Sequence, residues 1–220
     1  MNKSFKTWVV FDFDGTLADS ALESLTILKR LAPQMGFRRV EDEDVEYLRG
    51  KTTKEILKFL DIGPLLLPRV VYKCRKELEN RFKTIESHVS NDEWEKLLSL
   101  GCGIGIVTSN SLVNVETFLE RNFNSRPHFV HAGTSIFGKK KTLFKLCKKL
   151  KMEKGLYIGD ETRDIVAAKA AGWVAGSVSW GFNRQPILES FGPYKMFTDP
   201  SQLSSEIGKV VRSWQEKEWQ

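Results

Sequence analysis

The chain has 220 residues, which is room for one large domain or for one domain that carries a smaller insertion. Hydrophobic residues make up 41% and charged residues 28% of it, a composition that excludes a disordered or fibrous protein. No apolar stretch approaches the roughly 18 residues of a membrane-spanning helix. Asp12 and Asp14 interrupt what would have to be the apolar region of a signal peptide. We therefore expect a cytoplasmic protein with no membrane partner.

The three cysteines, Cys74, Cys102 and Cys147, are scattered and form no Cys-x-x-Cys pair. An odd, scattered set argues against a disulfide framework and against a thiolate zinc site. We expect reduced thiols that are partly buried.

The net charge is +6, and much of the excess lies in the lysine-rich stretch Lys139–Lys154. Its apolar residues recur at helical spacing, which predicts an amphipathic helix with a solvated lysine face. A site for nucleic acid would need aromatic rings among the cations, and Phe144 is the one aromatic residue in this stretch. The pattern therefore argues against nucleic acid as a partner.

Strand-length apolar runs occur near the N-terminus and then repeatedly in the second half, where helical patterns separate them. The predicted strands are Trp8–Phe13, Ile104–Thr108, Phe129–Ala132, Gly155–Ile158 and Trp173–Val178. This alternation predicts the α/β class, with a Rossmann-like doubly wound parallel sheet. In such sheets ligands bind beyond the carboxyl ends of the strands. Several of the predicted strands end in polar residues, so we expect a site there.

Between Asp19 and about His88 the pattern changes from strands to successive helices. These are predicted at Leu22–Leu31, Asp44–Tyr47, Lys54–Leu60 and Val70–Phe82. Glycines and prolines separate them, among them Pro33. We expect residues 19–87, the helical segment, to form an α-helical cap domain inserted into an α/β core made of residues 1–18 and 88–220.

Two further helices complete the expected core. Ser90 and Glu93 have the spacing of a capping box, which predicts the start of a helix through Leu100. A terminal helix is expected from Ser204, with an apolar face that includes Trp214.

The run Asp12-Phe13-Asp14-Gly15 directly follows the first predicted strand. Two carboxylates spaced two apart on an ending strand would point to the same side and repel each other. Burying them together is costly unless a cation or a shared proton offsets the charge. A surface loop fits poorly after so apolar a strand, so this pair is a candidate catalytic site.

A second acidic group, Asp160 and Asp164, follows the predicted strand Gly155–Ile158. Either residue could serve a helix start, Asp160 as the N-cap and Asp164 as a favourable charge in the first turn. With two strands ending in carboxylates, a divalent cation is the better interpretation. Oxygen ligands without histidine or cysteine favour Mg²⁺ over zinc.

Two further features could bind an anion. Ser109 and Asn110 follow another strand and open a helix, where a hydroxyl and free N–H groups can hold an anion or merely cap the helix. Lysines occupy positions 139, 140 and 141, and one of them could supply charge to a phosphate.

In this order, the run from Asp12 to Thr16, the loop at Ser109, the lysine triplet and Gly159-Asp160-x-x-x-Asp164 resemble the four motifs of haloacid dehalogenase-like hydrolases. The helical segment resembles the C1-type cap of that family. Residues 179–182, Ser-Trp-Gly-Phe, are similar to its phosphoglycolate phosphatase-like branch. The resemblance covers nearly the whole chain and implies an enzyme that hydrolyses a small-molecule phosphate ester.

The resemblance also implies the catalytic roles. Asp12 would be the nucleophile and would form an aspartyl-phosphate, and Asp14 would act as general acid and then as general base. Lys139 would neutralise charge between the nucleophile and the phosphate. Many relatives have proline after this lysine where this chain has Lys140, so the choice among positions 139, 140 and 141 stays open.

The implied cofactor is Mg²⁺, held by Asp12, the backbone carbonyl of Asp14 and Asp160, with Asp164 in support. The implied substrate-binding residues come from three different parts of the chain. They are Thr16, Arg49, Lys51, Ser109 and Asn110. Arg49 and Lys51 flank a glycine turn in the helical segment and could meet an anionic leaving group, or the turn could simply be exposed to solvent.

Several alternatives stay open from the sequence. A sugar-phosphate mutase of the same family is one, although Thr16 after Asp14-Gly15 favours the hydrolases. Dehalogenation is disfavoured, because it does not use the acid that Asp14 supplies. A non-catalytic nucleic-acid-binding protein that uses Lys139–Lys154 is another, although the complete motifs argue against it. We expect a monomer or a dimer.

Overall fold

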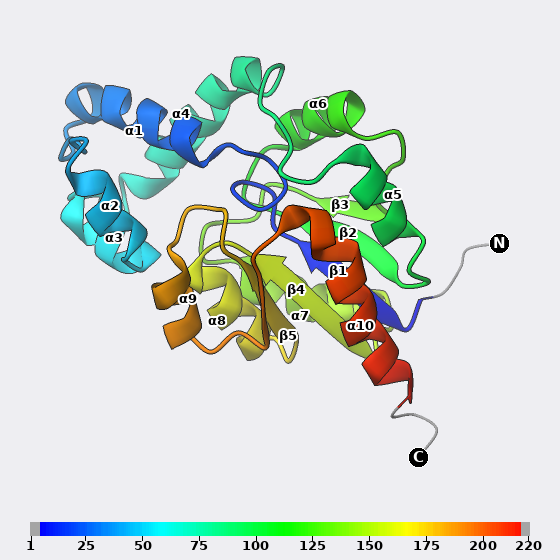
Figure 1. Ribbon diagram of the computed structural model, residues 1–220. Coiled ribbons are helices and arrows are strands. Elements are labelled where there is room, and N and C mark those ends of the chain that lie inside the picture. Colours follow the sequence, from blue (N-terminus) through cyan, green and yellow to red (C-terminus); the bar gives the residue numbers. More distant parts are fainter. Residues whose placement is uncertain (1–4, 217–220) are drawn as a thin grey trace.

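The computed structural model of the protein describes residues 5–216. A parallel sheet forms its centre (Figure 1). The strands are β1 (Thr7–Phe11), β2 (Gly103–Val107), β3 (Phe129–His131), β4 (Lys154–Gly159), β5 (Val174–Val178) and β6 (Lys195–Phe197). They make a six-stranded sheet in the order β3-β2-β1-β4-β5-β6. The α/β class and the doubly wound parallel sheet are therefore confirmed.

Strand β1 lies in the middle of the sheet and pairs with β2 on one side and β4 on the other. Its side chains alternate between two buried layers: Val9 and Phe11 enter one hydrophobic cluster, and Trp8 and Val10 enter the other. A strand that is buried on both faces reads as a continuous apolar run, which is why β1 was recognisable from the sequence. The three strands β2, β1 and β4 are neighbours, so their carboxyl ends meet at one edge.

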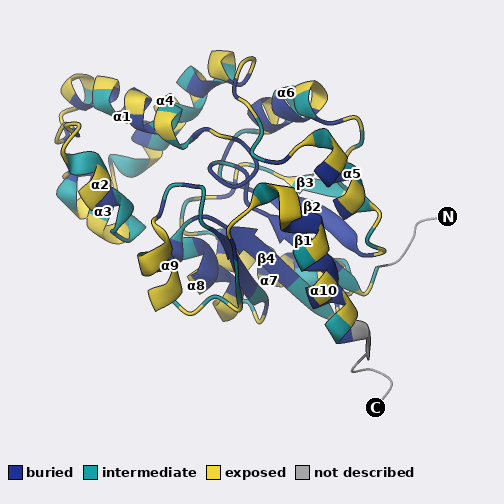
Figure 2. Cartoon of the chain, viewed as in Figure 1, coloured by how far each residue is buried: buried dark blue, intermediate teal, exposed yellow. Residues whose placement is uncertain are grey.

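Helices cover both faces of the sheet, as the burial pattern in Figure 2 shows. On the Val9 face lie α5 (Asn91–Leu98), α6 (Leu112–Asn122) and α10 (Leu203–Glu216). On the Trp8 face lie α7 (Lys139–Lys149), α8 (Thr162–Ala170) and α9 (Gln185–Ser190). None of the helices within residues 5–216 is both long and apolar enough to cross a membrane.

The helical segment contains only helices and turns between Ala21 and Arg81, and Figure 1 shows them grouped beside the core. They are α1 (Ala21–Met35), α2 (Asp44–Arg49), α3 (Thr53–Phe59) and α4 (Leu67–Arg81). The expectation that Pro33 separates helices was wrong, because α1 continues through it to Met35. Leu25, Leu31 and Ala32 of α1 are buried, and this packing holds the helix together past the proline.

The capping box predicted at Ser90 forms only in half. The Ser90 hydroxyl accepts a hydrogen bond from the Glu93 N–H at 3.2 Å, as expected. The Glu93 carboxylate does not return to Ser90. It is buried and accepts a hydrogen bond from the Ser204 N–H at 2.5 Å, at the start of α10. A contact between distant helices therefore replaces the local one.

The C-terminal part of the sheet was missed in the sequence. Helix α9 and strand β6 are both short, and only Phe197 of β6 is buried. One buried residue gives no recognisable alternation.

Candidate active site

Three loops meet at the carboxyl edge of the sheet because β1 lies between β2 and β4. The loop after β1 carries Asp12 and Asp14, the loop after β2 carries Ser109 and Asn110, and the loop after β4 carries Asp160. Residues that are as much as 148 positions apart in the sequence thereby become neighbours. This edge is also where the strand order reverses, the usual position of a ligand site in such sheets.

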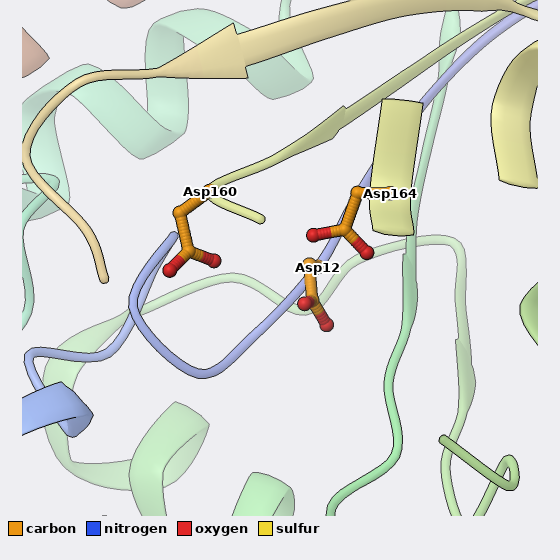
Figure 3. A group of neighbouring side chains, drawn as sticks. All are labelled: Asp12, Asp160 and Asp164. Atoms are coloured by element: carbon orange, nitrogen blue, oxygen red, sulfur yellow. The ribbon is translucent and has the colours of Figure 1, made fainter. Parts of the chain in front are cut away.

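The carboxylates of Asp12, Asp160 and Asp164 form a compact buried cluster. One oxygen of each lies within 4.8 Å of the others, and Figure 3 shows the three side chains gathered together. Burial raises the pKa of Asp12 and, with repulsion from neighbouring carboxylates, holds the pKa of Asp160 well above its usual range. Burial also raises the pKa of Asp164, to about 6, even though Lys139 opposes the shift. Such a cluster requires positive charge.

Lys139 supplies part of that charge. Its ammonium lies 2.6 Å from Asp12 and 2.5 Å from Asp164, and its side chain is buried. Burial alone would lower the pKa of Lys139, but the two carboxylates outweigh it and raise the pKa. Lys140 and Lys141 are exposed. Of the three lysines that the sequence left open, the structure therefore brings only Lys139 to the acidic cluster.

Asp160 is held from several directions at once. It accepts hydrogen bonds from the Thr16 hydroxyl at 2.9 Å and from the Phe182 N–H at 2.8 Å. A Cβ atom added at Gly15 or at Gly181 would lie 2.2 Å from an atom of this side chain. Both glycines are therefore needed for close approach, and Gly15 also has a left-handed φ of 73°.

The Asp14 carboxylate is held by two donor side chains. The Ser20 hydroxyl donates to it at 2.8 Å, and the Asn110 side-chain amide donates to both of its oxygens at 2.8 and 3.0 Å. Burial raises the pKa of Asp14, although these two hydrogen bonds oppose the shift. A carboxyl with a raised pKa suits a general acid.

The expected substrate-binding residues lie in different surroundings. Ser109 lines the cavity next to Asp14. The Asn110 N–H donates to the Thr108 hydroxyl at 3.0 Å, and the Thr16 hydroxyl points to Asp160. The phosphate and substrate contacts expected of Asn110 and Thr16 therefore stay predictions.

Arg49 and Lys51 do not line this cavity. The Arg49 guanidinium donates to the carbonyls of Phe182 and Gly181, at 2.9 and 3.2 Å. The Lys51 ammonium lies 4.6 Å from the centre of the Tyr47 ring. Arg49 thus joins the helical segment to the loop that holds Asp160.

Three charged residues at this edge were not singled out in the sequence. Glu161 and Arg163 form a 2.5 Å ion pair, and both line the cavity with Arg75 of α4. Arg75 donates to the Thr134 carbonyl at 3.2 Å, so it reaches the core from the helical segment. Glu161 and Arg163 lie within the Gly-Asp-Glu-Thr-Arg-Asp run, which was a usable signal; Arg75 sits in an ordinary charged helix and had none.

The donor set fits a hard divalent cation. The three residues of the cluster offer carboxylate oxygens alone. With the neighbouring Asp14 and Glu161, the carboxylates at this edge outnumber the two cations close to them, Lys139 and Arg163. Mg²⁺ prefers oxygen ligands of this kind. Asp12 and Asp160, together with Asp164, are the residues that could hold it.

Comparison with known proteins gives a consistent picture. The family model described as haloacid dehalogenase-like hydrolase matches residues 9–177. A phosphoglycolate phosphatase of Synechococcus elongatus is 31% identical over 208 residues, which cover 93% of this chain and 98% of that protein. A phosphoglycolate phosphatase of Vibrio cholerae is 27% identical over 229 residues, covering 95% and 96%.

Solved structures share the fold. The crystal structure of a hydrolase from Pseudomonas syringae superposes with a TM-score of 0.73 at 19% identity, covering 93% of this chain and 99% of that one. The residues matched by the family model include the loops that carry Asp12, Ser109 and Asp160. The chain belongs to the haloacid dehalogenase-like hydrolase family.

Proposed function

We propose that the protein is a Mg²⁺-dependent phosphatase that hydrolyses a small phosphate monoester, such as phosphoglycolate, through an aspartyl-phosphate. The observation that carries this proposal is the position of Asp12, 2.6 Å from the Lys139 ammonium and within the buried carboxylate cluster. The relatives named phosphoglycolate phosphatase support the choice of ester. The helical segment serves as the cap, and the cytoplasm is the proposed location.

In the first step, an oxygen of Asp12 attacks the phosphorus and the bond from phosphorus to the ester oxygen breaks. Asp14 donates its proton to the departing alkoxide, which leaves as an alcohol. Asn110 and Ser20 fix the Asp14 carboxyl in place for this transfer. Lys139 stays protonated and neutralises negative charge between Asp12 and the phosphate.

In the second step, water attacks the phosphorus of the aspartyl-phosphate. Asp14, now a carboxylate, takes a proton from this water, and the bond between phosphorus and the Asp12 oxygen breaks. Inorganic phosphate leaves and Asp12 is restored. Ser109, which lines the same cavity as Asp14, would bind a phosphate oxygen through its hydroxyl.

Bound Mg²⁺ would reduce the repulsion between a carboxylate nucleophile and a phosphate dianion. Asp12, Asp160 and the backbone carbonyl of Asp14 would hold it. Asp164 would act in support, since it shares the Lys139 ammonium with Asp12.

The test is a panel of phosphate esters assayed with Mg²⁺ and with EDTA, with the Asp12→Asn variant as the blank. We expect phosphate release that needs Mg²⁺ and is absent in Asp12→Asn. Activity that persists in Asp12→Asn would contradict the nucleophile, and activity that is equal in EDTA would contradict the cofactor. Transfer of the phosphoryl group to a second sugar phosphate rather than to water would favour the mutase alternative.

A further inference from the structure

A cavity of about 250 Å³ runs from the carboxylate cluster into the helical segment. At the core end it is lined by Asp14, Ser109, Asn110 and Asp160. In the helical segment its lining is mostly aliphatic, from side chains of α1, α3 and α4 that include Leu25, Leu28, Ile56, Leu57, Val70 and Val71. The two ends of the cavity therefore differ sharply in polarity.

The charged residues of the lining gather at the core end. Arg163 is paired with Glu161, and burial raises the pKa of Asp14 although the charge of Arg163 opposes the shift. Arg75 donates a hydrogen bond to the Thr134 carbonyl of the core; burial lowers the pKa of Arg75, and the nearby Asp14 carboxylate only partly opposes this shift. Beyond Arg75, the helical-segment lining within the described residues has hydroxyls at Ser24 and Thr53 but no charged side chain. The Thr53 hydroxyl already donates to Glu161 at 3.1 Å.

From this lining we infer that the organic group of the substrate ester is apolar, an alkyl or aryl group that occupies the aliphatic end of the cavity. This inference rests on the proposed phosphatase function, and within it favours an apolar ester over the phosphoglycolate named above. A carboxylate placed at the aliphatic end would lose its hydration without gaining a partner.

At the aliphatic end of the cavity an apolar group gains binding free energy, whereas a charged group loses it. Each buried methylene contributes roughly a fourfold increase in affinity. Hexyl phosphate is therefore expected to exceed methyl phosphate in kcat/KM by on the order of 10²–10³-fold. Phosphoglycolate, which ends in a carboxylate, is expected to fall below hexyl phosphate.

The experiment measures kcat/KM for methyl phosphate, hexyl phosphate and phosphoglycolate with Mg²⁺, on wild type and on two matched variants. Leu28→Trp fills the cavity from α1, and Leu65→Trp places the same ring on the helical segment at a position that is 98% exposed. We expect Leu28→Trp to lower the ratio of hexyl to methyl phosphate at least tenfold, and Leu65→Trp to leave it unchanged. Thermal unfolding of each variant checks that it is folded.

A binding measurement separates this inference from the phosphatase function. Methylphosphonate and hexylphosphonate are not hydrolysed, and titration calorimetry on the Mg²⁺-loaded wild type compares them directly. Tighter binding of hexylphosphonate supports the inference, and equal binding overturns it. Turnover of phosphoglycolate without any preference for hexyl phosphate overturns the inference and leaves the phosphatase in place. If no ester is hydrolysed, the proposed function fails, and the substrate class fails with it.

Discussion

The Lys139 ammonium lies 2.6 Å from the Asp12 carboxylate, and both side chains are buried. A buried charge that loses its partner is costly, by about 3–5 kcal/mol. The same lysine also contacts Asp164 at 2.5 Å, so one cation serves two carboxylates. We therefore expect Lys139 to contribute to stability and, in the proposed mechanism, to the chemistry.

The first prediction concerns that lysine. Lys139→Met is expected to lower kcat/KM by about 10²-fold or more, because the charge that meets the phosphate is lost. Lys140→Met removes an exposed lysine of the same helix and is expected to stay within about twofold, since surface charges contribute little. Steady-state kinetics and urea unfolding measure both effects. Loss of activity in Lys140→Met with a normal Lys139→Met would move the catalytic role to Lys140.

The second prediction concerns Gly15. A Cβ atom there would lie 2.2 Å from the Asp160 carboxylate, so Gly15→Ala should displace Asp160 and weaken Mg²⁺ binding at least tenfold. Gly101 has a similar φ of 76° with open space around it, so Gly101→Ala carries the backbone strain of about 1–2 kcal/mol alone. Mg²⁺ titrations of activity distinguish the two variants. Equal Mg²⁺ requirements in both would show that strain, not displacement of Asp160, is responsible.

The third prediction concerns Arg49, which donates to the carbonyls of Phe182 and Gly181. The Phe182 N–H in turn holds Asp160. Arg49→Ala is therefore expected to lower kcat/KM about tenfold, and to do so equally for every phosphate ester. Lys51→Ala, which removes a cation stacked on Tyr47, is the control and should have a smaller effect. A loss confined to carboxylated esters would instead assign Arg49 to the leaving group, one of the two alternatives that the sequence left open.

The fourth prediction concerns the thiols. Burial raises the pKa of Cys74 and Cys102 to about 11. The thiolate is the reactive form, so alkylation at pH 8 is expected to be on the order of 10²-fold slower in the folded protein than in urea, where a thiol has a pKa near 8.5. Mass spectrometry of iodoacetamide-treated protein measures this rate for each cysteine. Equal rates in folded and unfolded protein would contradict the burial.

The same shift has a consequence for stability. Because the folded pKa of these thiols lies above the unfolded value, their contribution is complete below pH 8.5 and is lost as the pH rises through about 11. The melting temperature should therefore fall across this range. For each protein the fall is measured from its own melting temperature at pH 7. This fall should be smaller in Cys102→Ala than in wild type.

Much of the fold could be predicted from the sequence. The apolar runs of β1 and β2 and of the neighbouring β4 are buried on both faces, so each stands out as a continuous hydrophobic stretch. Strand β6 was missed because one buried residue, Phe197, gives no pattern. Helix α1 was cut short at Pro33, because the packing that carries a helix past a proline is not visible in local sequence.

Some residues of the candidate site could be predicted from the sequence and others could not. Asp12, Asp14, Asp160 and Asp164 could be found because each follows an apolar strand, and parallel strands end at one edge. Arg75 could not be found, since it comes from α4 in the helical segment and its side chain meets the core at the Thr134 carbonyl, a contact that no local pattern predicts. Glu93 shows the same limit. Its spacing from Ser90 predicted a local capping box, but its carboxylate accepts a hydrogen bond from the Ser204 N–H instead.

The sequence by itself determined the parallel sheet and the acidic residues at its edge, because hydrophobic periodicity and strand ends are local properties of the chain. Only the tertiary structure decided that Lys139 rather than Lys140 faces Asp12, that Arg49 binds backbone carbonyls, and that the cavity above Asp14 is aliphatic. These outcomes depend on which surfaces pack against each other. Neighbouring positions of one helix turn point in different directions, and only the packed core selects which of them is buried.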